Sequence, residues 1–224
     1  PGQSGLRRVC ARTRRTRAHA LSFGTFRTMT VATHATTANA DAAWVEPAPS
    51  VLILPGWQGS GPGHWQMHWA CMPGCTVVEQ NDWMRPRRGD WLARLDEVVI
   101  DAPGPVVLVA HSLGCILVAA WAAFSRHTAK VRAALLVAPG DVEVPAMQEI
   151  LPGWLPIERQ PLPFRSMVVG SDNDPYCSAE RAQQLARDWS ARWHSLGAAG
   201  HINANSSLGD WPEGHALLHT LLKD

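Results

Sequence analysis

The apolar segment from Val106 to Ala120 constrains the fold more than any other part of the chain, because a serine interrupts it. Its first four residues, VVLV, show no polar alternation, which is typical of a parallel strand buried on both faces. After Ser112, apolar residues recur at steps of three and four, which predicts a helix with one buried stripe. The segment therefore predicts a strand, a tight turn centred on Ser112, and a helix.

A serine on such a turn is placed like a nucleophile. The turn carries the Ser112 hydroxyl out of the sheet and points the backbone N–H of Leu113 toward a developing oxyanion, as in the nucleophile elbow of acyl-transfer enzymes. Ala110 and Gly114 flank the serine two positions away, where larger side chains would collide with a neighbouring strand or helix. Ala110 departs from the G-x-S-x-G consensus by one methyl group. The alternative is an ordinary strand–turn–helix with a capping serine.

The body of the chain is acidic, although the whole chain is nearly neutral. Its 224 residues include 20 Lys and Arg against 19 Asp and Glu, for a formal net charge of +1. Residues 1–28 hold seven arginines and no acidic residue, which leaves a net charge of −6 for residues 29–224. Since phosphate contacts need a basic face, we expect no nucleic-acid binding by the folded body.

We expect one domain over residues 50–224 and a separate segment over residues 1–49. The length suits one domain with a sizeable core. Residues 1–49 are rich in arginine and then in small residues, without periodicity, so we expect them to be disordered. The basic leader has three interpretations: a basic arm, a targeting peptide, or translation begun upstream of the true start. We favour the last, with Met29 as the candidate start.

The sequence predicts no membrane span, no metal site and no cofactor. No apolar run approaches the ~20 residues that a bilayer span needs. The five scattered cysteines fit reduced thiols in a cytoplasmic protein. The histidine pair His64 and His68 lacks the glutamate of a zinc-binding H-E-x-x-H motif. We expect a cytoplasmic protein whose partner is a small-molecule acyl substrate.

Strand-like and helix-like segments alternate along the rest of the chain, which implies a mostly parallel sheet with helices on both faces. The proline-rich segment 139–163 follows a predicted strand and forms either a small cap over the site or a plain surface loop. Strands are predicted at 51–54, 76–79, 106–109, 133–138, 166–169 and 193–196, and helices at 89–102, 113–124, 178–190 and 211–222.

A nucleophilic serine needs a base and a group that orients the base. In α/β-hydrolases the chain order is serine, acid, histidine. Asp172 and Asp174 both lie in the loop after a predicted strand, and His201 lies between the last predicted strand and the last helix. Chain order therefore predicts His201 as the base and leaves both carboxylates as candidates for the acid.

Five motifs follow one another along the chain: PGWQGSGPGHWQMHW at 55–69, NDW at 81–83, VAHSLG at 109–114, GSDNDP at 170–175 and GHIN at 200–203. In this order they resemble the small serine hydrolases of the YdeN and retinoblastoma-binding protein 9 type. The resemblance covers residues 50–223 and implies a compact α/β-hydrolase fold, here with a minimal cap, and a Ser–His–Asp triad. Because the acid of that family directly precedes a proline, the resemblance favours Asp174, with Asp172 as the fallback.

The expected reaction is hydrolysis of a small ester, thioester or amide through an acyl-enzyme. Ser112 would attack the carbonyl carbon, His201 would carry the proton, and Asp174 would orient the imidazole. The backbone N–H groups of Leu113 and Trp57 would form the oxyanion hole.

Two tryptophans, Trp65 and Trp154, are candidates for the substrate pocket, although tryptophans this dense also fill cores. A non-catalytic interaction protein on a hydrolase scaffold is the alternative function. The complete set of nucleophile, base and acid favours catalysis.

Overall fold

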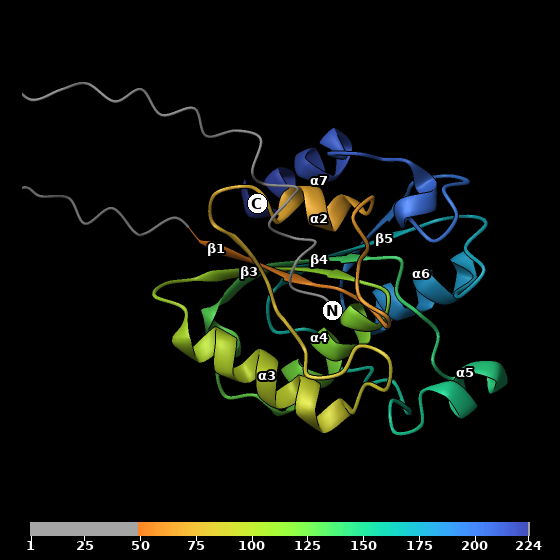
Figure 1. Cartoon of the computed structure of the whole chain (residues 1–224), viewed down its shortest axis with the longest axis horizontal. Helices are drawn as coiled ribbons and strands as arrows, with labels where there is room; N and C mark the ends of the chain where they lie inside the picture. The colour runs from red at the N-terminus through yellow and green to blue at the C-terminus, as the bar shows by residue number, and fades with distance from the viewer. Residues whose placement is uncertain (1–48, 224) are drawn as a thin grey trace, which may run out of the picture. The chain divides into compact units, whose positions relative to one another are not determined.

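The computed structural model describes residues 49–223, in which six parallel strands form one sheet in the order β2-β1-β3-β4-β5-β6 (Figure 1). The parallel sheet is as predicted, and each predicted strand overlaps an observed one. Of the predicted leader at 1–49, only Pro49 is described; Met29 lies outside the described residues. The strands are β1 (Ser50–Leu54), β2 (Cys75–Val77), β3 (Val106–His111), β4 (Val131–Val137), β5 (Arg165–Gly170) and β6 (Arg192–Ser195).

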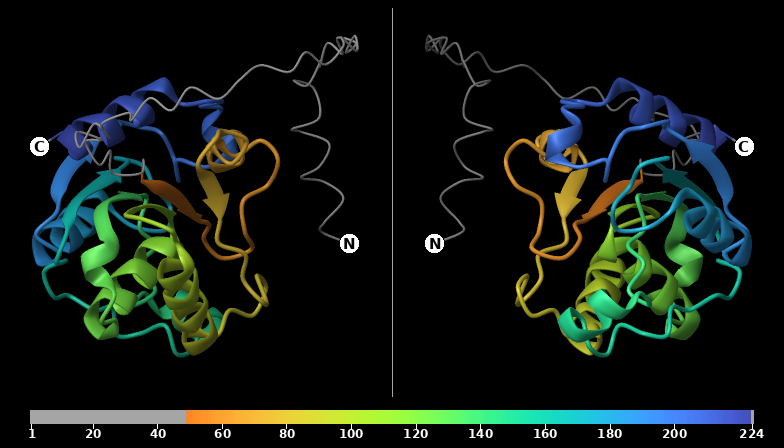
Figure 2. Two further views of the ribbon diagram at one scale, coloured as in Figure 1. Left: turned by 90° about the vertical axis from the view of Figure 1, so that its left-hand side faces the viewer. Right: turned by 90° about the vertical axis from the view of Figure 1, so that its right-hand side faces the viewer.

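Helices cover both faces of this sheet. On one face lie α3 (Arg88–Asp101), α4 (Leu113–Phe124) and α6 (Ala179–Asp188), and on the other lie α2 (Trp65–Trp69) and α7 (Pro212–Lys223) (Figures 1 and 2). Four of the five were predicted from apolar periodicity. Helix α2 was not, because five residues are too few to show a 3.6-residue period.

Strand β3 shows why its sequence is a continuous apolar run. Alternate residues of a strand point to opposite faces. Val106 and Leu108 pack in the core on the α3–α4 face, whereas Val107 and Val109 pack in the core on the α2–α7 face. All four are 0% exposed, which explains why no polar residue alternates with the apolar ones in this part of β3.

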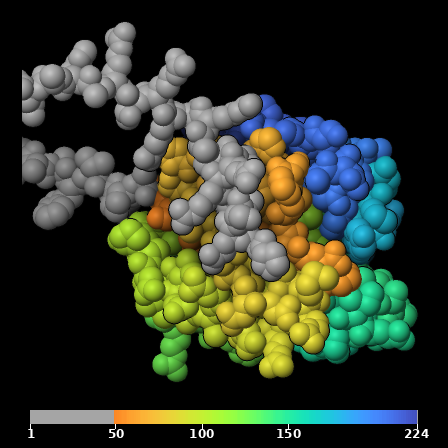
Figure 3. Space-filling model, in the orientation of Figure 1, coloured from red at the N-terminus to blue at the C-terminus, as the bar shows by residue number. Residues whose placement is uncertain are grey.

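The proline-rich segment contains one short helix, α5 (Pro145–Ile150), and is fastened to the body of the domain. The Glu143 carboxylate forms ion pairs with Arg159, at 2.6 Å, and with Arg181 of α6. The indole N–H of Trp154 donates to the Pro86 carbonyl oxygen at 2.9 Å. Figure 3 shows the surface around α5 lying against the loop that precedes α3. The segment is therefore a fixed wall of the domain.

Within residues 49–223, no helix has the length and apolar character needed to cross a membrane. The cytoplasmic location and the lack of nucleic-acid binding stay predictions.

Candidate active site

The site lies where the strand order reverses. From β1 the chain adds β2 on one side and β3 on the other, and ligands of open parallel sheets bind at the carboxyl ends of strands at such a point. Ser112 follows β3, Asp174 follows β5 and His201 follows β6. The carboxyl ends of parallel strands share one edge of the sheet, so the topology brings the three residues together.

Ser112 has the strained backbone that the turn demands. Its φ is 55° and its ψ is −120°, in a region that residues other than glycine seldom adopt. Its N–H donates to the carbonyl oxygen of Val137 in β4 at 3.0 Å, which ties the turn to the neighbouring strand. The hydroxyl projects from this turn at the N-terminus of α4.

Two glycines allow the turn at Ser112 and the end of β1 to approach each other closely. A Cβ on Gly114 would lie 2.4 Å from the carbonyl oxygen of Leu54, and a Cβ on Gly56 would lie 2.7 Å from the Cβ of Ser112. Both distances are far below van der Waals contact. Ala110 has room for its methyl group while remaining fully buried, which explains why this departure from the consensus is tolerated.

A hydrogen-bonded chain joins the three predicted catalytic residues. His201 Nε2 lies 3.0 Å from Ser112 Oγ, and His201 Nδ1 lies 2.8 Å from Asp174 Oδ2. The side chains of His201 and Asp174 are 9% and 3% exposed, so their interaction is shielded from solvent. This is the spacing that proton transfer from a serine to a histidine base requires.

The two candidate carboxylates have different neighbours. Asp172 accepts a hydrogen bond from the hydroxyl of Ser195 at 2.8 Å, and its side chain does not contact His201. Asp174 bonds His201 and also accepts from the backbone N–H of Tyr176 at 2.9 Å. The geometry therefore favours Asp174, as the resemblance did.

Two buried side chains hold the loop that carries His201. His111 Nε2 lies 2.9 Å from the His201 carbonyl oxygen; because a carbonyl only accepts, this nitrogen carries the proton and donates it. Burial holds the pKa of His111 well below its usual value, so the ring is neutral. The indole N–H of Trp65 donates to the next carbonyl, that of Ile202, at 2.9 Å. Ile202 has a φ of 47°, a costly conformation for a β-branched residue, which these bonds help to maintain.

His64 is the N-cap of α2 and packs against His111. Its Nδ1 accepts from the backbone N–H of Gln66 at 3.2 Å, and its ring packs edge-on against His111 with centroids 4.6 Å apart. Burial, and secondarily the charge of His201, lowers the pKa of His64 to about 4. The His111 ring in turn packs edge-on against His201, with centroids 4.8 Å apart, so three imidazoles lie side by side at the site.

Two backbone N–H groups beside Ser112 fit an oxyanion hole. Outside helices and strands, no backbone hydrogen bond within residues 49–223 has the N–H of Leu113 or that of Trp57 as its donor. The loop after β1 is fixed by two bonds, from Gln58 N–H to the Trp83 carbonyl at 2.9 Å and from the Trp57 indole to the Met84 carbonyl at 3.0 Å. The placement of Trp57 is therefore set by the NDW segment as well as by β1.

Ser112 lies between two cavities. One, of about 360 Å³, is lined mainly by polar residues and includes His201; the other, of about 20 Å³, is mainly apolar. The predicted pocket residues line neither. Trp65 is 1% exposed and packs in the α2–α7 core, and Trp154 is fully buried beside Trp91, because both indoles satisfy their N–H groups on backbone carbonyls inside the domain.

Sequence reasoning missed several side chains that line the cavities, among them Tyr176, Gln58 and Met147. Tyr176 lines both cavities and packs against the His201 ring with centroids 4.6 Å apart. Gln58, whose φ is 67°, lines the polar cavity, and Met147 of α5 lines the apolar one. Tyr176 directly follows the GSDNDP motif, two residues after Asp174, and this position was the available signal.

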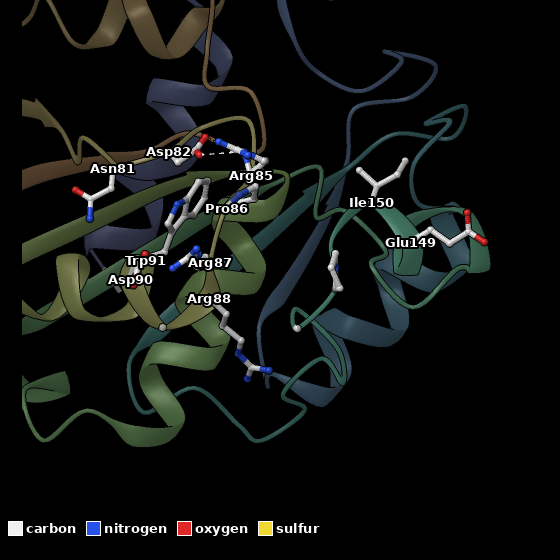
Figure 4. A pocket seen from close by; sticks show the side chains of 13 residues that line it. Asn81, Asp82, Arg85, Pro86, Arg87, Arg88, Asp90, Trp91, Glu149 and Ile150 are labelled. Atoms are coloured by element: carbon white, nitrogen blue, oxygen red, sulfur yellow. Dashed lines mark hydrogen bonds and ion pairs between the residues drawn. The ribbon is translucent and has the colours of Figure 1, made fainter.

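Ser112 does not line a third and larger cavity, of about 790 Å³. Figure 4 shows the side chains that line this cavity. The cavity opens between residues 81–91 and residues 149–153, and its lining contains three arginines and three acidic residues, Asp82, Asp90 and Glu149. Arg85 pairs with Asp82 at 3.5 Å, and Arg88 pairs with Glu158 at 3.0 Å. The cavity therefore offers no strongly cationic surface.

The topology and the half-buried serine at the sheet's switch point are those of an α/β-hydrolase. A family model described as serine hydrolase matches residues 51–220, and the chain belongs to that family. It is an enzyme of the hydrolase class. No curated protein sequence matches the chain.

Solved structures agree with this assignment. A YdeN-like hydrolase from Pectobacterium atrosepticum is 26% identical, with a TM-score of 0.68 over 78% of this chain and 90% of that chain. The ydeN gene product from B. subtilis is 19% identical, with a TM-score of 0.64 over 79% of this chain and all of that one. An α/β-hydrolase, MGS-MChE2, from the metagenome of lagoon sediments in Morocco is 15% identical, with a TM-score of 0.60 over 80% and 92% of the two chains. The predicted YdeN-type resemblance and α/β-hydrolase fold are confirmed.

Proposed function

We propose that this hydrolase cleaves a small carboxylic ester, thioester or amide through a triad of Ser112, His201 and Asp174. The observation that carries the proposal is the continuous hydrogen-bonded chain from Asp174 through His201 to Ser112. Its last bond, between His201 Nε2 and Ser112 Oγ, measures 3.0 Å. Proton transfer along such a chain converts a weak hydroxyl nucleophile into a reactive one.

The reaction proceeds in two halves. Ser112 Oγ attacks the substrate carbonyl carbon while its proton passes to His201 Nε2, and the carbonyl electrons move onto the oxygen. The N–H groups of Leu113 and Trp57 bind this oxyanion. As the carbonyl re-forms, His201 returns the proton to the departing alcohol, thiol or amine, which leaves an acyl-serine. Water then attacks the acyl-serine by the same sequence and releases a carboxylic acid.

Asp174 acts by orienting and stabilising the imidazole. Its carboxylate accepts the Nδ1–H of His201, which leaves Nε2 unprotonated and facing Ser112. When the ring becomes an imidazolium, the buried carboxylate balances its charge. The solvent exclusion around Asp174 strengthens that interaction.

A fluorophosphonate probe tests the proposal, because it phosphonylates only an activated serine. We expect intact-mass spectrometry to show one adduct on the wild-type protein and none on Ser112→Ala. Ser125→Ala, at the far end of α4, is the matched control and should label normally, since that hydroxyl bonds Asp96. An unlabelled wild-type protein, or a labelled Ser112→Ala variant, would refute the triad and favour a non-catalytic interaction role.

A further inference from the structure

The two cavities beside Ser112 differ in size and chemistry. The larger, of about 360 Å³, is lined by His201 and by polar residues that include Gln58, Asn203 and Asn205. The smaller, of about 20 Å³, is bounded mainly by Leu113, Val142, Met147 and Leu151. Ser112, Trp57 and Tyr176 line both, so one substrate bound at Ser112 can extend into each.

The direction of proton transfer decides which part of the substrate enters which cavity. In the tetrahedral intermediate the carbon carries Ser112 Oγ, the oxyanion, the leaving group and the acyl substituent. His201 must protonate the leaving atom, so the leaving group lies on the side of His201, in the larger cavity. The oxyanion faces Leu113 N–H and Trp57 N–H. The acyl substituent therefore lies in the smaller, apolar cavity.

The smaller cavity has room for very little. A volume of about 20 Å³ is only slightly more than one water molecule needs, so a methyl group fills it. Its floor is close to the nucleophile, because a Cβ at Gly140 would lie 3.4 Å from Ser112 Oγ. Met147 and Leu151 form another part of its lining, and Leu151 is only 2% exposed.

The segment that contains Met147 and Leu151 is bonded to the rest of the domain on both sides. Glu143 joins the start of the segment to Arg159 and Arg181, and its other oxygen accepts the N–H of Ile157 at 3.0 Å. Trp154 is bonded to the Pro86 carbonyl at 2.9 Å and is fully buried. The part of the wall that holds Met147 and Leu151 lies between these anchors along the chain.

We infer that the enzyme selects acetyl-sized acyl groups and accepts the larger part of its substrate as the leaving group. This inference rests on the proposed function, since it assigns sides to a serine-centred acyl transfer. Met147 is the specificity-determining side chain that limits the length of the acyl group.

Two isomeric esters test the inference. Propyl acetate and methyl butyrate have the same atoms and alkoxide leaving groups, and they differ in which side of the ester carries the propyl group. Two additional methylenes do not fit the apolar cavity, so kcat/KM for propyl acetate should exceed that for methyl butyrate by at least about tenfold. Equal rates, or a preference for methyl butyrate, would overturn the inference.

Variants on α5 assign the selectivity to the cavity wall. Met147→Ala should reduce the ratio to about threefold or less by raising kcat/KM for methyl butyrate. Ile150→Ala is the matched control: Ile150 lies on the same short helix, is 47% exposed and does not line the apolar cavity. An unchanged ratio in Met147→Ala, or the same change in Ile150→Ala, contradicts the role given to Met147.

Labelling by the fluorophosphonate probe distinguishes failure of the proposed function from failure of the inferred selectivity. Measured on each variant, it also gives the concentration of folded active sites. A protein that neither labels nor hydrolyses either ester refutes the proposed function itself. A protein that labels at Ser112 but hydrolyses the isomers equally, or hydrolyses neither, refutes only the selectivity for acetyl-sized groups.

Discussion

The Nε2–H of His111 donates a hydrogen bond to the carbonyl oxygen of His201, 2.9 Å away. The residue before the nucleophile thus fixes the backbone of the base, 90 positions further along the chain. His111 is the last residue of β3 and His201 lies in the loop after β6, so the bond ties the end of β3 to that loop. His111 is a positioning residue, because it acts through His201.

Replacing His111 should therefore affect turnover more than substrate binding. In His111→Leu the His201 carbonyl loses its donor in a buried environment, and we expect kcat to fall about tenfold, equivalent to about 1.4 kcal/mol, with a smaller change in KM. His111→Gln places an amide N–H near the same point and should recover part of kcat. Steady-state kinetics on an acetate ester measures both. Equal losses in the two variants would show that the role is packing alone.

The carboxylate that orients His201 can be identified by two parallel substitutions. Asp174→Asn should lower kcat by about 10³- to 10⁴-fold, because the amide cannot favour the tautomer that leaves Nε2 free to accept the serine proton. Asp172→Asn should stay within about threefold of the wild type, since an amide oxygen still accepts from Ser195 and no charge near the base is needed. A larger loss in Asp172→Asn would transfer the orienting role to that residue.

The stability of the turn at Ser112 depends on Gly114. A methyl group there would lie 2.4 Å from the Leu54 carbonyl oxygen and 3.1 Å from that of Pro55, both backbone atoms that cannot move aside. We expect Gly114→Ala to lower the free energy of unfolding by about 1–3 kcal/mol. Gly89→Ala is the control: Gly89 lies in α3 with open space around it, so stability should be unchanged or rise by up to about 1 kcal/mol. Chemical denaturation checks both, and a neutral Gly114→Ala would contradict the close approach.

The buried ring of His64 predicts that the domain loses stability in mild acid. Its pKa is about 4 in the folded protein and 6.5 in the unfolded chain. Above pH 6.5 both states hold the ring neutral; between pH 6.5 and pH 4 the unfolded chain takes up a proton that the folded protein does not, so stability falls. Below pH 4 both states are protonated and the loss stops growing. The full contribution, reached below pH 4, amounts to about 3 kcal/mol.

His64→Asn isolates this effect, because asparagine can still cap α2 but cannot be protonated. Urea denaturation at pH 7 and at pH 4.5 should show that the variant loses about 2 kcal/mol less than the wild type between the two values. Titrating groups that do not contact His64 are common to both proteins and cancel in the comparison. The same pH dependence in both proteins would show that His64 is protonated in the fold.

Much of the fold and the order of the site were predictable because their causes are local. The apolar run of β3, the serine and the small flanking residues are neighbours along the chain, and steric limits on the backbone act between neighbours. Parallel strands separated by helices place every strand's carboxyl end at one edge. That rule, with the chain order, was enough to select Ser112 and His201.

The tertiary structure alone decided the walls of the site. Trp65 and Trp154 show no sequence difference from a pocket tryptophan, and only their neighbours reveal that both indoles are enclosed in the core. Met147 belongs to a segment that sequence left as either a cap or a loop, and its contact with the cavity at Ser112 depends on ion pairs to α6. Whether a side chain is buried or faces a cavity depends on residues distant along the chain, and local patterns carry no information about such long-range packing.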